Sequence, residues 1–561
     1  MSNDQLASLI RRRKISGKPR DFIELAEALM SSKSIELCIA SLTGKELSKL
    51  QAEVLVADEQ LLETGLLYET KDSFKLVDNA VQILSNLKTS PLAITSANLE
   101  FQADLMPLAA IASFETQQAI TEIVLDTEQR ILRVVNKNAV GLPDQKLLAQ
   151  QVHKSLDFAR SCYSFAQRIG LIRARDSRWW LTSAAKNWLA MSIENRWLVL
   201  AQNWLANLGA PGVHELSQLV QGQPNAELRA AFAQVFPAAD ASVEGNLDLL
   251  ANQAQWLGLS VGQQVTPALK ALLEGDEAKA LELVSEHLPK TQNRLIAQGD
   301  QTLVATGPLP TEVEILVRSF AELEQVSVAS TYRVTDASLT FGLECGLTEM
   351  QIRDALTSLT ASALPQPIDY LIKQAAQRFG RIRIRSASGL ERSIVQASDV
   401  VLLSQILNDQ RLRPFAFQPI TANSLSSRFE PEVIYFGLRE NGYLAVRVDA
   451  DDKVLSPKLS ISWEALDSSV EADPIVALVA ELRKTDERVG QNPSDDDLLR
   501  QLQLAIKNRS TVKVHISLRD GTEQTYELKV SGLANGRLRG LDAKADAERV
   551  LPLSQINRVE F

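Results

Sequence analysis

Metal-binding and disulfide-forming residues are scarce in this chain, which has three cysteines and four histidines among 561 residues. Cys38, Cys162 and Cys345 lie far apart in the sequence and form no Cys-x-x-Cys pair. Zinc sites and disulfide scaffolds need closely spaced ligands or paired cysteines. The sequence therefore predicts no metal site and favours a reducing compartment.

Long apolar runs are also missing. No stretch approaches the roughly 18–20 consecutive apolar residues of a membrane-spanning helix, and no apolar run follows the basic residues 11–14 as a signal peptide requires. We therefore expect a cytoplasmic protein without a membrane partner. The net charge of −10 argues against a protein that coats nucleic acid through its overall field. Any DNA contact must come from local patches.

The sequence motifs of common catalysts are absent as well. Gly17-Lys18 is followed by Pro19, and Gly44-Lys45 by Glu46; neither has the earlier glycine of a phosphate-binding loop. We find no Gly-x-Ser-x-Gly, His-Glu-x-x-His or glycine-rich dinucleotide motif. The sequence predicts no ATPase, helicase or nuclease activity and no cofactor. An enzyme of an unrecognised kind is the alternative.

A repeated local pattern is the most informative positive feature. Residues 65–84 and 170–189 align over their full length, and residues 258–273 form a shorter third copy. Each copy starts with glycine after an expected helix, continues as two short strands around a turn, and enters another helix. The turns fall at Asp72-Ser73 and Asp176-Ser177 in the two longer copies, and the helices start at Val77, Thr182 and Thr266. This order is typical of a winged-helix hairpin.

The three hairpins differ in charge. The second carries Arg173, Arg175, Arg178, Trp179 and Trp180, whereas the first is balanced and the third has no charged residue. Arginine contacts phosphate and tryptophan stacks on bases, so we expect the second hairpin to bind nucleic acid. Strand alternation predicts that one tryptophan faces the core, and Trp180 is our candidate for the outer side. Protein-binding or purely architectural hairpins are the alternative.

From about residue 291 the pattern changes to alternating strands and helices. Strands are expected within 295–305 and near 331–334, and helices after Pro310, within 336–360 and from Pro365 to Gly380. The following run, residues 381–385, predicts a strand with three arginines on one face. Between Lys373 and Arg413, eight basic residues face three acidic ones. The candidate phosphate-binding residues here are Lys373, Arg378, Arg381, Arg383, Arg385 and Arg392; the alternative is an edge strand with a solvated basic face.

The C-terminal part divides into two segments. Residues 451–496 are rich in acidic residues and predict a linker around one helix over 474–484. Residues 497–561 predict a helix over 498–508, followed by alternating strands. Asp520-Gly521 and Asn535-Gly536 are dipeptides favoured in hairpin turns. This segment is therefore expected to form a small β-rich domain.

Short stretches within residues 295–413 carry a family resemblance. They are AQGDQTLVA (297–305), GPL (307–309), YRVT (332–335), PQPIDYLI (365–372) and RFGR (378–381). Together they resemble the helicase-associated, XPB N-terminal-like module of actinobacterial proteins of this size. In that family the module precedes the motor and helps to engage damaged or distorted DNA. The resemblance implies a DNA-linked role, and it implies no helicase activity because the motor motifs are absent.

The last 65 residues carry a second resemblance, in the stretches VHIS (514–517), GRLRGLD (536–542) and RVLPLSQINRV (549–559). They resemble a WYL domain, an SH3-like barrel that often senses a nucleic-acid or nucleotide ligand in bacterial regulators. This chain departs from the pattern, because Arg537-Leu538-Arg539 replaces the eponymous Trp-Tyr-Leu run and Ser517 replaces a usual aromatic. The candidate phosphate-binding residues in this segment are Arg537, Arg539, Arg549 and Arg558.

The predicted fold class is mainly α with α+β parts, in several domains with tandem winged-helix modules and a small C-terminal β-barrel-like domain. The predicted domains are winged-helix-like (1–95), helical with a second winged helix (96–210), a third winged-helix-like helical domain (211–290), the XPB N-terminal-like α+β domain (291–450), the acidic linker (451–496) and the WYL-like domain (497–561).

The expected function is that of a non-catalytic DNA-binding or helicase-associated accessory protein in bacterial DNA repair or transcription. Its expected partners are single-stranded or distorted duplex DNA and a helicase or transcription protein. The alternatives are a protein-interaction scaffold and a transcription regulator that responds to a nucleotide or oligonucleotide at the C-terminal domain.

Overall fold

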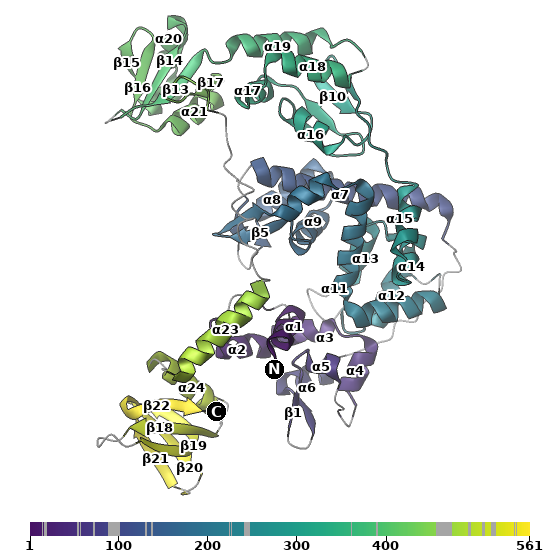
Figure 1. Ribbon diagram of the computed structural model, residues 1–561, viewed down its shortest axis with the longest axis vertical. Coiled ribbons are helices and arrows are strands. Elements are labelled where there is room, and N and C mark those ends of the chain that lie inside the picture. Colours follow the sequence, from purple (N-terminus) through teal and green to yellow (C-terminus); the bar gives the residue numbers. More distant parts are fainter. Residues whose placement is uncertain are drawn as a thin grey trace. The chain divides into compact units, whose positions relative to one another are not determined.

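The chain forms two compact units (Figure 1), the first comprising Met1–Ala40, Lys45–Lys88 and Glu471–Phe561, and the second comprising Ser41–Gly44 and Thr89–Val470. The computed structural model describes residues 1–561 except for 14, 16–18, 53–54, 56–57, 71–72, 88–100, 130–131, 136–138, 224, 226, 240–246, 361, 389–390, 456–473, 492–494, 508–510, 518–522, 544, 546 and 561. The expected turns at Asp72 and at Asp520-Gly521, and residues 456–473 and 492–494 of the expected acidic linker, fall outside the described residues.

The first unit contains both ends of the chain. Its N-terminal elements are α1 (Asn3–Arg13), α2 (Phe22–Met30), α3 (Ser32–Ala40), α4 (Gly44–Leu50), α5 (Glu59–Leu62), β1 (Leu67–Glu69), β2 (Phe74–Leu76) and α6 (Asp78–Asn86). Its C-terminal elements are α23 (Pro474–Gln491), α24 (Asp495–Lys507), β18 (Thr511–Ser517), β19 (Glu523–Ala534), β20 (Arg537–Asp542), β21 (Ala547–Pro552) and β22 (Ile556–Glu560).

Helices from opposite ends of the sequence share one core in this unit. α1 lies against α23 (Figure 1), and the buried side chains Leu6, Leu9 and Ile10 of α1 cluster with Leu478 and Leu482 of α23. Apolar side chains three and four residues apart line one face of a helix, so each helix buries one stripe against the other. The N-terminal segment therefore depends on the C-terminal one for part of its core.

The C-terminal strands form one antiparallel sheet in the order β21-β20-β19-β18-β22. α24 packs on this sheet through Leu498, Leu502 and Ala505. The turn at Asn535-Gly536 is confirmed, with φ of 51° and 71° at its two central residues, as a type I′ hairpin turn requires. The barrel expectation needs correction, because no ladder among the described residues joins the edge strands β21 and β22, and the sheet stays open.

The second unit begins with a large helical region. Its elements are η1 (Ala103–Leu105), α7 (Met106–Gln129), β3 (Val134–Val135), β4 (Ala139–Val140), α8 (Leu142–Gln151), α9 (Leu156–Arg168), β5 (Ile172–Arg175), β6 (Arg178–Leu181), α10 (Ser183–Ala190), α11 (Ile193–Gly222), α12 (Leu228–Val235), α13 (Leu247–Trp256), β7 (Ser260–Val261), β8 (Gln264–Val265), α14 (Pro267–Leu273) and α15 (Glu277–Ser285). One continuous core runs through this region from Ala110 to Leu288 and includes the fully buried Trp188, Trp197 and Trp204.

An α+β region follows in the same unit. Its elements are β9 (Leu295–Ala297), β10 (Thr302–Ala305), α16 (Thr311–Arg318), β11 (Glu322–Gln325), β12 (Thr331–Arg333), α17 (Asp336–Glu344), α18 (Glu349–Leu359), α19 (Gln366–Arg378), β13 (Ile382–Ser386), β14 (Ser393–Ala397), α20 (Val400–Asn408), η4 (Gln410–Phe415), β15 (Gln418–Thr421), β16 (Ser424–Ser427), α21 (Pro431–Glu440) and β17 (Ala445–Arg447). The sheets run β11-β12-β10-β9 and β15-β16-β14-β13-β17, and each has its own core. The expected strands and helices of this region are therefore confirmed.

The local pattern of the threefold repeat is also confirmed. Gly65, Gly170 and Gly258 all have positive φ, between 65° and 75°, a conformation that glycine adopts at the end of a helix without strain. In every copy the residue that precedes the second helix donates its backbone N–H to the carbonyl of the residue after the glycine, at 3.0–3.1 Å. The assignment of these units as winged helices, and the boundaries between the six expected segments, stay predictions.

The chain is thus a multidomain protein of mixed α and β structure, as the predicted fold class stated in its broad outline. No described helix is both long enough and apolar enough to span a bilayer.

Candidate nucleic-acid interface

The second hairpin separates its side chains cleanly between two faces. β5 and β6 pair so that Arg173 lies opposite Trp180 and Arg175 opposite Arg178. Directly opposed residues of an antiparallel pair point to the same side, so these four side chains share one face. The three arginines are exposed and Trp180 is partly exposed. All four predicted residues are therefore brought together.

The other face of this hairpin belongs to the core. Ile172, Trp179 and Leu181 are 2%, 5% and 0% exposed. Trp179 is therefore the buried member of the tryptophan pair, as strand alternation predicts. The apolar face anchors the hairpin to the helical region, while the basic face stays open to solvent.

A tight turn fixes the tip of the hairpin. Asp176 and Ser177 have φ of 49° and 60°, and positive φ at both central residues gives the turn a twist that matches the strands. The indole Nε1–H of Trp180 donates to the backbone oxygen of Arg175 at 3.1 Å. This bond holds the indole along the hairpin, close to the arginines.

A fourth arginine joins the basic face from a distant segment. Arg133 forms a β-bridge with Arg178, supported by a 2.9 Å hydrogen bond from the Trp179 N–H to the Leu132 carbonyl. Arg133 therefore lies on the same side of the sheet as Arg178, and it is exposed. Sequence reasoning missed this residue, because the only local signal is one basic residue between Leu132 and Val134. We call Arg133, Arg173, Arg175, Arg178 and Trp180 the hairpin face.

The helix before this hairpin is not available to a ligand along most of its surface. On α9 only Asp157 and Arg160 are exposed, whereas Phe158, Cys162 and Phe165 are buried. In a helix-turn-helix protein the second helix enters the major groove. Here the corresponding helix is enclosed by its own core, so the hairpin face is the accessible part of the module.

The predicted arginine strand, β13, is found, but not at the edge of its sheet. β13 pairs with β14 on one side and with β17 on the other. The edge-strand alternative is therefore wrong, because a short parallel strand from beyond residue 440 covers that side. Ile382 and Ile384 face the core, and Arg383 and Arg385 share the opposite face.

Most basic residues of this region already have acidic partners. Arg378, Arg381 and Arg392 lie 3.8, 3.6 and 2.6 Å from Asp336, Asp399 and Glu430, and Arg383 and Arg385 both contact Asp452. Exposed ion pairs of this kind contribute only about 0–1 kcal/mol each. Lys373 is exposed on α19 and forms no ion pair with a described residue. The region is therefore less basic than its composition suggests.

The four candidate arginines of the C-terminal domain do not form one cluster. The strand register places Arg537, Arg539 and Arg558 on the outer face of the sheet, whereas Arg549 lies on the side of the core. Arg549 lies 3.3 Å from the carboxylate of Asp542 and over the ring of Tyr526, and Arg558 lies 3.1 Å from Glu560. A single phosphate cannot contact arginines on both faces.

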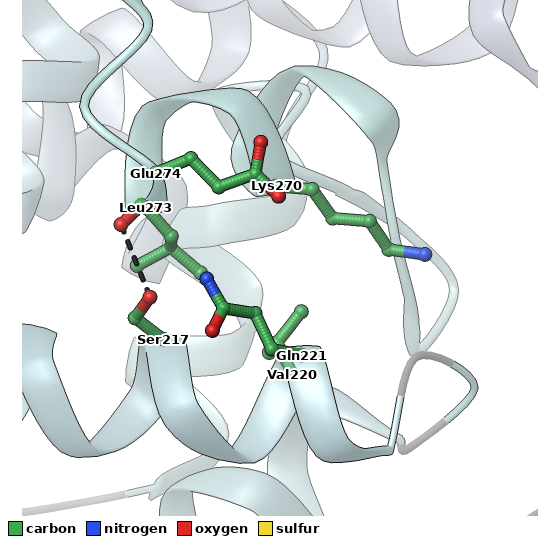
Figure 2. A pocket seen from close by; sticks show the side chains of 6 residues that line it. All are labelled: Ser217, Val220, Gln221, Lys270, Leu273 and Glu274. Carbon is green, nitrogen blue, oxygen red and sulfur yellow. Dashed lines mark hydrogen bonds between the residues drawn. The ribbon is translucent and has the colours of Figure 1, made fainter.

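A small cleft of about 230 Å³ lies between α11 and α14 (Figure 2), lined by Ser217, Val220, Gln221, Lys270, Leu273 and Glu274. The hydroxyl of Ser217 donates to the Leu273 carbonyl at 3.1 Å. One lysine and one glutamate give the lining no net charge, and the Ser217 hydroxyl is bonded to a backbone carbonyl rather than to a base that could activate it. We assign it no role in ligand binding.

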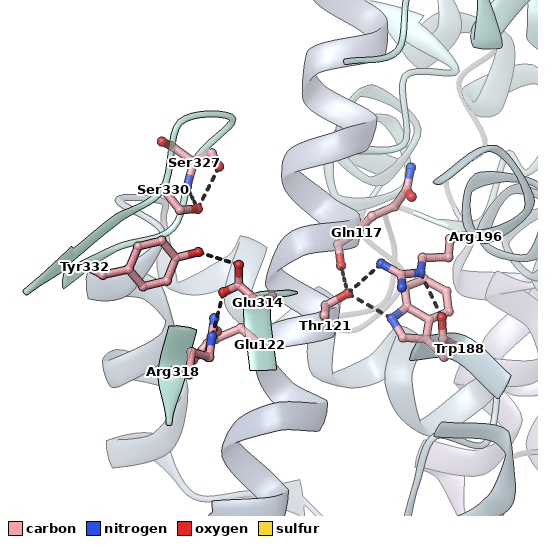
Figure 3. A network of polar contacts seen from close by, with 10 residues as sticks. All are labelled: Gln117, Thr121, Glu122, Trp188, Arg196, Glu314, Arg318, Ser327, Ser330 and Tyr332. Atoms are coloured by element: carbon pink, nitrogen blue, oxygen red, sulfur yellow. Dashed lines mark hydrogen bonds and ion pairs between the residues drawn. The ribbon is translucent and has the colours of Figure 1, made fainter. Parts of the chain in front are cut away.

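A buried polar network joins the helical region to the α+β region (Figure 3). Arg318 of α16 donates to Glu122 of α7 at 2.5 Å and to Glu314 at 2.6 Å, and the Tyr332 hydroxyl donates to Glu314. Burial lowers the pKa of Arg318, but the two carboxylates outweigh it and raise that pKa above its ordinary value. Both carboxylates accept hydrogen bonds from Arg318, and Glu314 accepts a second one from Tyr332, so we assign the network a structural role.

Comparison with known proteins connects the chain to helicases. Residues 295–421, from β9 to the end of β15, match the family described as "Helicase conserved C-terminal domain". The match falls on the segment whose resemblance we described, but its description names a C-terminal domain, so the N-terminal-like placement stays a prediction. This match places the chain in the class of helicase-related proteins.

A curated protein to which the chain is similar is "DNA 3'-5' helicase XPB" of Mycobacterium tuberculosis (strain ATCC 25618 / H37Rv). The chain is 26% identical to it over 182 residues, which is 32% of this chain and 29% of the relative. The match thus spans less than a third of the length of that curated relative.

Proposed function

We propose that this chain is a non-catalytic, helicase-related accessory protein that binds DNA through the hairpin face, with a preference for single-stranded or distorted DNA. In finer detail, it is an actinobacterial protein with winged-helix modules and a WYL-like C-terminal domain, and a helicase or transcription protein is its partner. The observation that carries the proposal is that Arg173, Arg175, Arg178 and Trp180 share one exposed face. Similarity to a DNA helicase supports the choice of ligand.

The buried state of α9 supports the preference. A hairpin without an accessible recognition helix can contact phosphates and one stacked base, but it cannot read several base edges in the major groove. Stacking on an indole needs an unpaired or displaced base. Single strands and junctions offer such bases, whereas an intact duplex does not.

The test is binding of the purified protein to labelled single-stranded, duplex and forked DNA over a salt series. Replacing Arg173, Arg175 and Arg178 by glutamine should weaken binding and lower the slope of log affinity against log salt by about 0.7–0.9 for each lost phosphate contact. For a matched comparison, Arg178→Gln is measured beside the control variant Arg160→Gln, which removes the same charge elsewhere. Arg160 is an exposed arginine of α9, paired with Asp157, outside the hairpin face.

Equal effects of Arg178→Gln and Arg160→Gln would contradict the proposal, because only total charge would then matter. No binding to any DNA at low salt would favour a protein-interaction scaffold. That alternative has its own support in the uncharged third hairpin and the acidic net charge.

A further inference from the structure

A tight turn after β17 holds one carboxylate in a fixed position. Val448 pairs with Val454, and the side chain of Asp449 accepts the backbone N–H groups of Asp451 and Lys453, both at 2.9 Å. Asp452 lies between them with φ of 63°. The turn is therefore defined by its own hydrogen bonds, with Asp452 at one of its central positions.

The carboxylate of Asp452 contacts two arginines of one strand. It is hydrogen-bonded to Arg383, and it lies 3.6 Å from Arg385. These arginines are two residues apart on β13, so they point to the same side, and pairing on both edges fixes their spacing. Two guanidinium groups around one anionic group is the arrangement with which proteins bind a phosphate.

Polar neighbours hold the two guanidinium groups in position on the sheet. Gln396 lies opposite Arg383 on β14, and Ser424 lies opposite Gln396 on β16. The Nε of Arg385 is buried and has no hydrogen-bond partner among the described residues. Arg385 also donates through a terminal nitrogen to the side-chain oxygen of Gln396, and the Nε of Arg383 donates to the Gly380 carbonyl at 3.0 Å, so both guanidinium groups are held in position.

We propose that Arg383 and Arg385 form a second phosphate-binding site, which Asp452 occupies in the free protein and which a nucleic-acid phosphate takes over by displacing this carboxylate. The choice of nucleic acid as ligand rests on the proposed function; the site itself is separate from the hairpin face. Asp452 thereby lowers the affinity of this site for nucleic acid. Binding is more selective, because only a ligand that displaces the carboxylate can occupy the site.

The contact is suited to displacement. The side chains of Asp452, Arg383 and Arg385 are 47%, 40% and 33% exposed. Water and salt screen such a pair, so its loss has a small cost. A phosphodiester brings the same single negative charge to the two arginines as the carboxylate does, and its binding also releases counterions from the nucleic acid, which drives the exchange.

The experiment compares Asp452→Asn with Asp451→Asn in binding to a labelled single-stranded oligonucleotide over a salt series. Asparagine tolerates the positive φ of residue 452, so the turn is retained without the charge. Asp451 is the matched control, because it is an exposed acid of the same turn whose side chain contacts neither arginine. Asp452→Gly is a second variant that also accepts this backbone conformation.

Asp452→Asn should bind about threefold to tenfold more tightly than the wild type, with a salt slope steeper by about 0.7–0.9 per phosphate gained. Asp451→Asn should change the affinity less than about twofold, because this exposed side chain contacts neither arginine and its charge is screened by water and salt. Adding Arg383→Gln and Arg385→Gln to Asp452→Asn should abolish the gain.

Equal gains from Asp451→Asn and Asp452→Asn, or no gain from either residue 452 variant, would overturn the proposal.

Repeating the comparison with the three hairpin arginines replaced separates this site from the proposed function. Both proposals stand if replacing the hairpin arginines abolishes binding by the protein with Asp452 but Asp452→Asn still increases binding in that background. If the wild type binds through the hairpin and residue 452 has no influence, only this inference fails. If the wild type does not bind and Asp452→Asn does, only the hairpin assignment fails.

Discussion

At the scale of single residues, Trp179 and Trp180 show how one position along a strand changes the role of a side chain. Trp179 is 5% exposed and belongs to the helical core, whereas Trp180 lies on the hairpin face. Identical residue types in adjacent positions therefore give a direct comparison of a packing residue with a binding residue.

Trp179→Ala should lower the free energy of unfolding by about 3–5 kcal/mol, because it leaves a large cavity. Trp180→Ala should change stability by less than about 1 kcal/mol and weaken single-stranded DNA binding by about 1–3 kcal/mol, the contribution of one stacked base. Denaturant unfolding and fluorescence anisotropy measure the two effects. Trp180→Phe, which keeps an aromatic ring, should retain most of the affinity; loss of stability rather than affinity in Trp180→Ala would contradict the assignment.

At the scale of the element, the three helix, glycine, hairpin and helix units share one backbone geometry in different surroundings. A Cβ atom at Gly258 would lie 2.3 Å from the Ala109 carbonyl oxygen, whereas a Cβ at Gly170 would meet nothing within 4 Å. Both glycines have positive φ. Both glycines therefore need a residue that accepts positive φ, but only Gly258 also lacks room for a side chain.

Gly170→Ala should therefore cost about 1–2 kcal/mol of unfolding free energy, from the left-handed backbone alone. Gly258→Ala should cost about 1–3 kcal/mol more, because the added methyl group forces a backbone shift in α7 or α13. Both residues lie in the same region, so one denaturant transition reports both. Equal losses in the two variants would show that packing around Gly258 relaxes freely.

At the scale of the whole molecule, the chain closes its first unit by bringing residues 1–88 together with residues 471–561. Leu482 is fully buried in the core that α23 shares with α1. The core around α1 is thus completed by a segment that is nearly 400 residues away, as 471 minus 88 gives 383. Long-range closure of this kind is slow, because loop entropy must be overcome before the contact forms.

Leu482→Ala should lower the stability of this unit by about 2–5 kcal/mol and speed amide hydrogen exchange in residues 3–13 as well as in α23. Exchange in the second unit should stay unchanged. Val476→Ala is the control, because Val476 lies on the same helix and is 45% exposed. Protection of residues 3–13 that survives Leu482→Ala would show that α1 is stable without α23.

The sequence by itself determined the local elements and the separation of side chains along them. Helix caps, glycine ends and strand alternation depend on residues within a few positions, so α16, α19, β13 and the hairpin β5–β6 were all predictable. Alternation alone also placed Arg173, Arg175, Arg178 and Trp180 on one face.

Only the tertiary structure decided which of these residues are accessible. It added Arg133 to the hairpin face, enclosed α9, placed β13 inside its sheet and brought Asp452 to Arg383 and Arg385. It also joined α1 to α23 and left the C-terminal sheet open. Each of these outcomes depends on contacts between residues far apart in the chain, which are set by the packing of whole elements and leave no pattern in the neighbouring sequence.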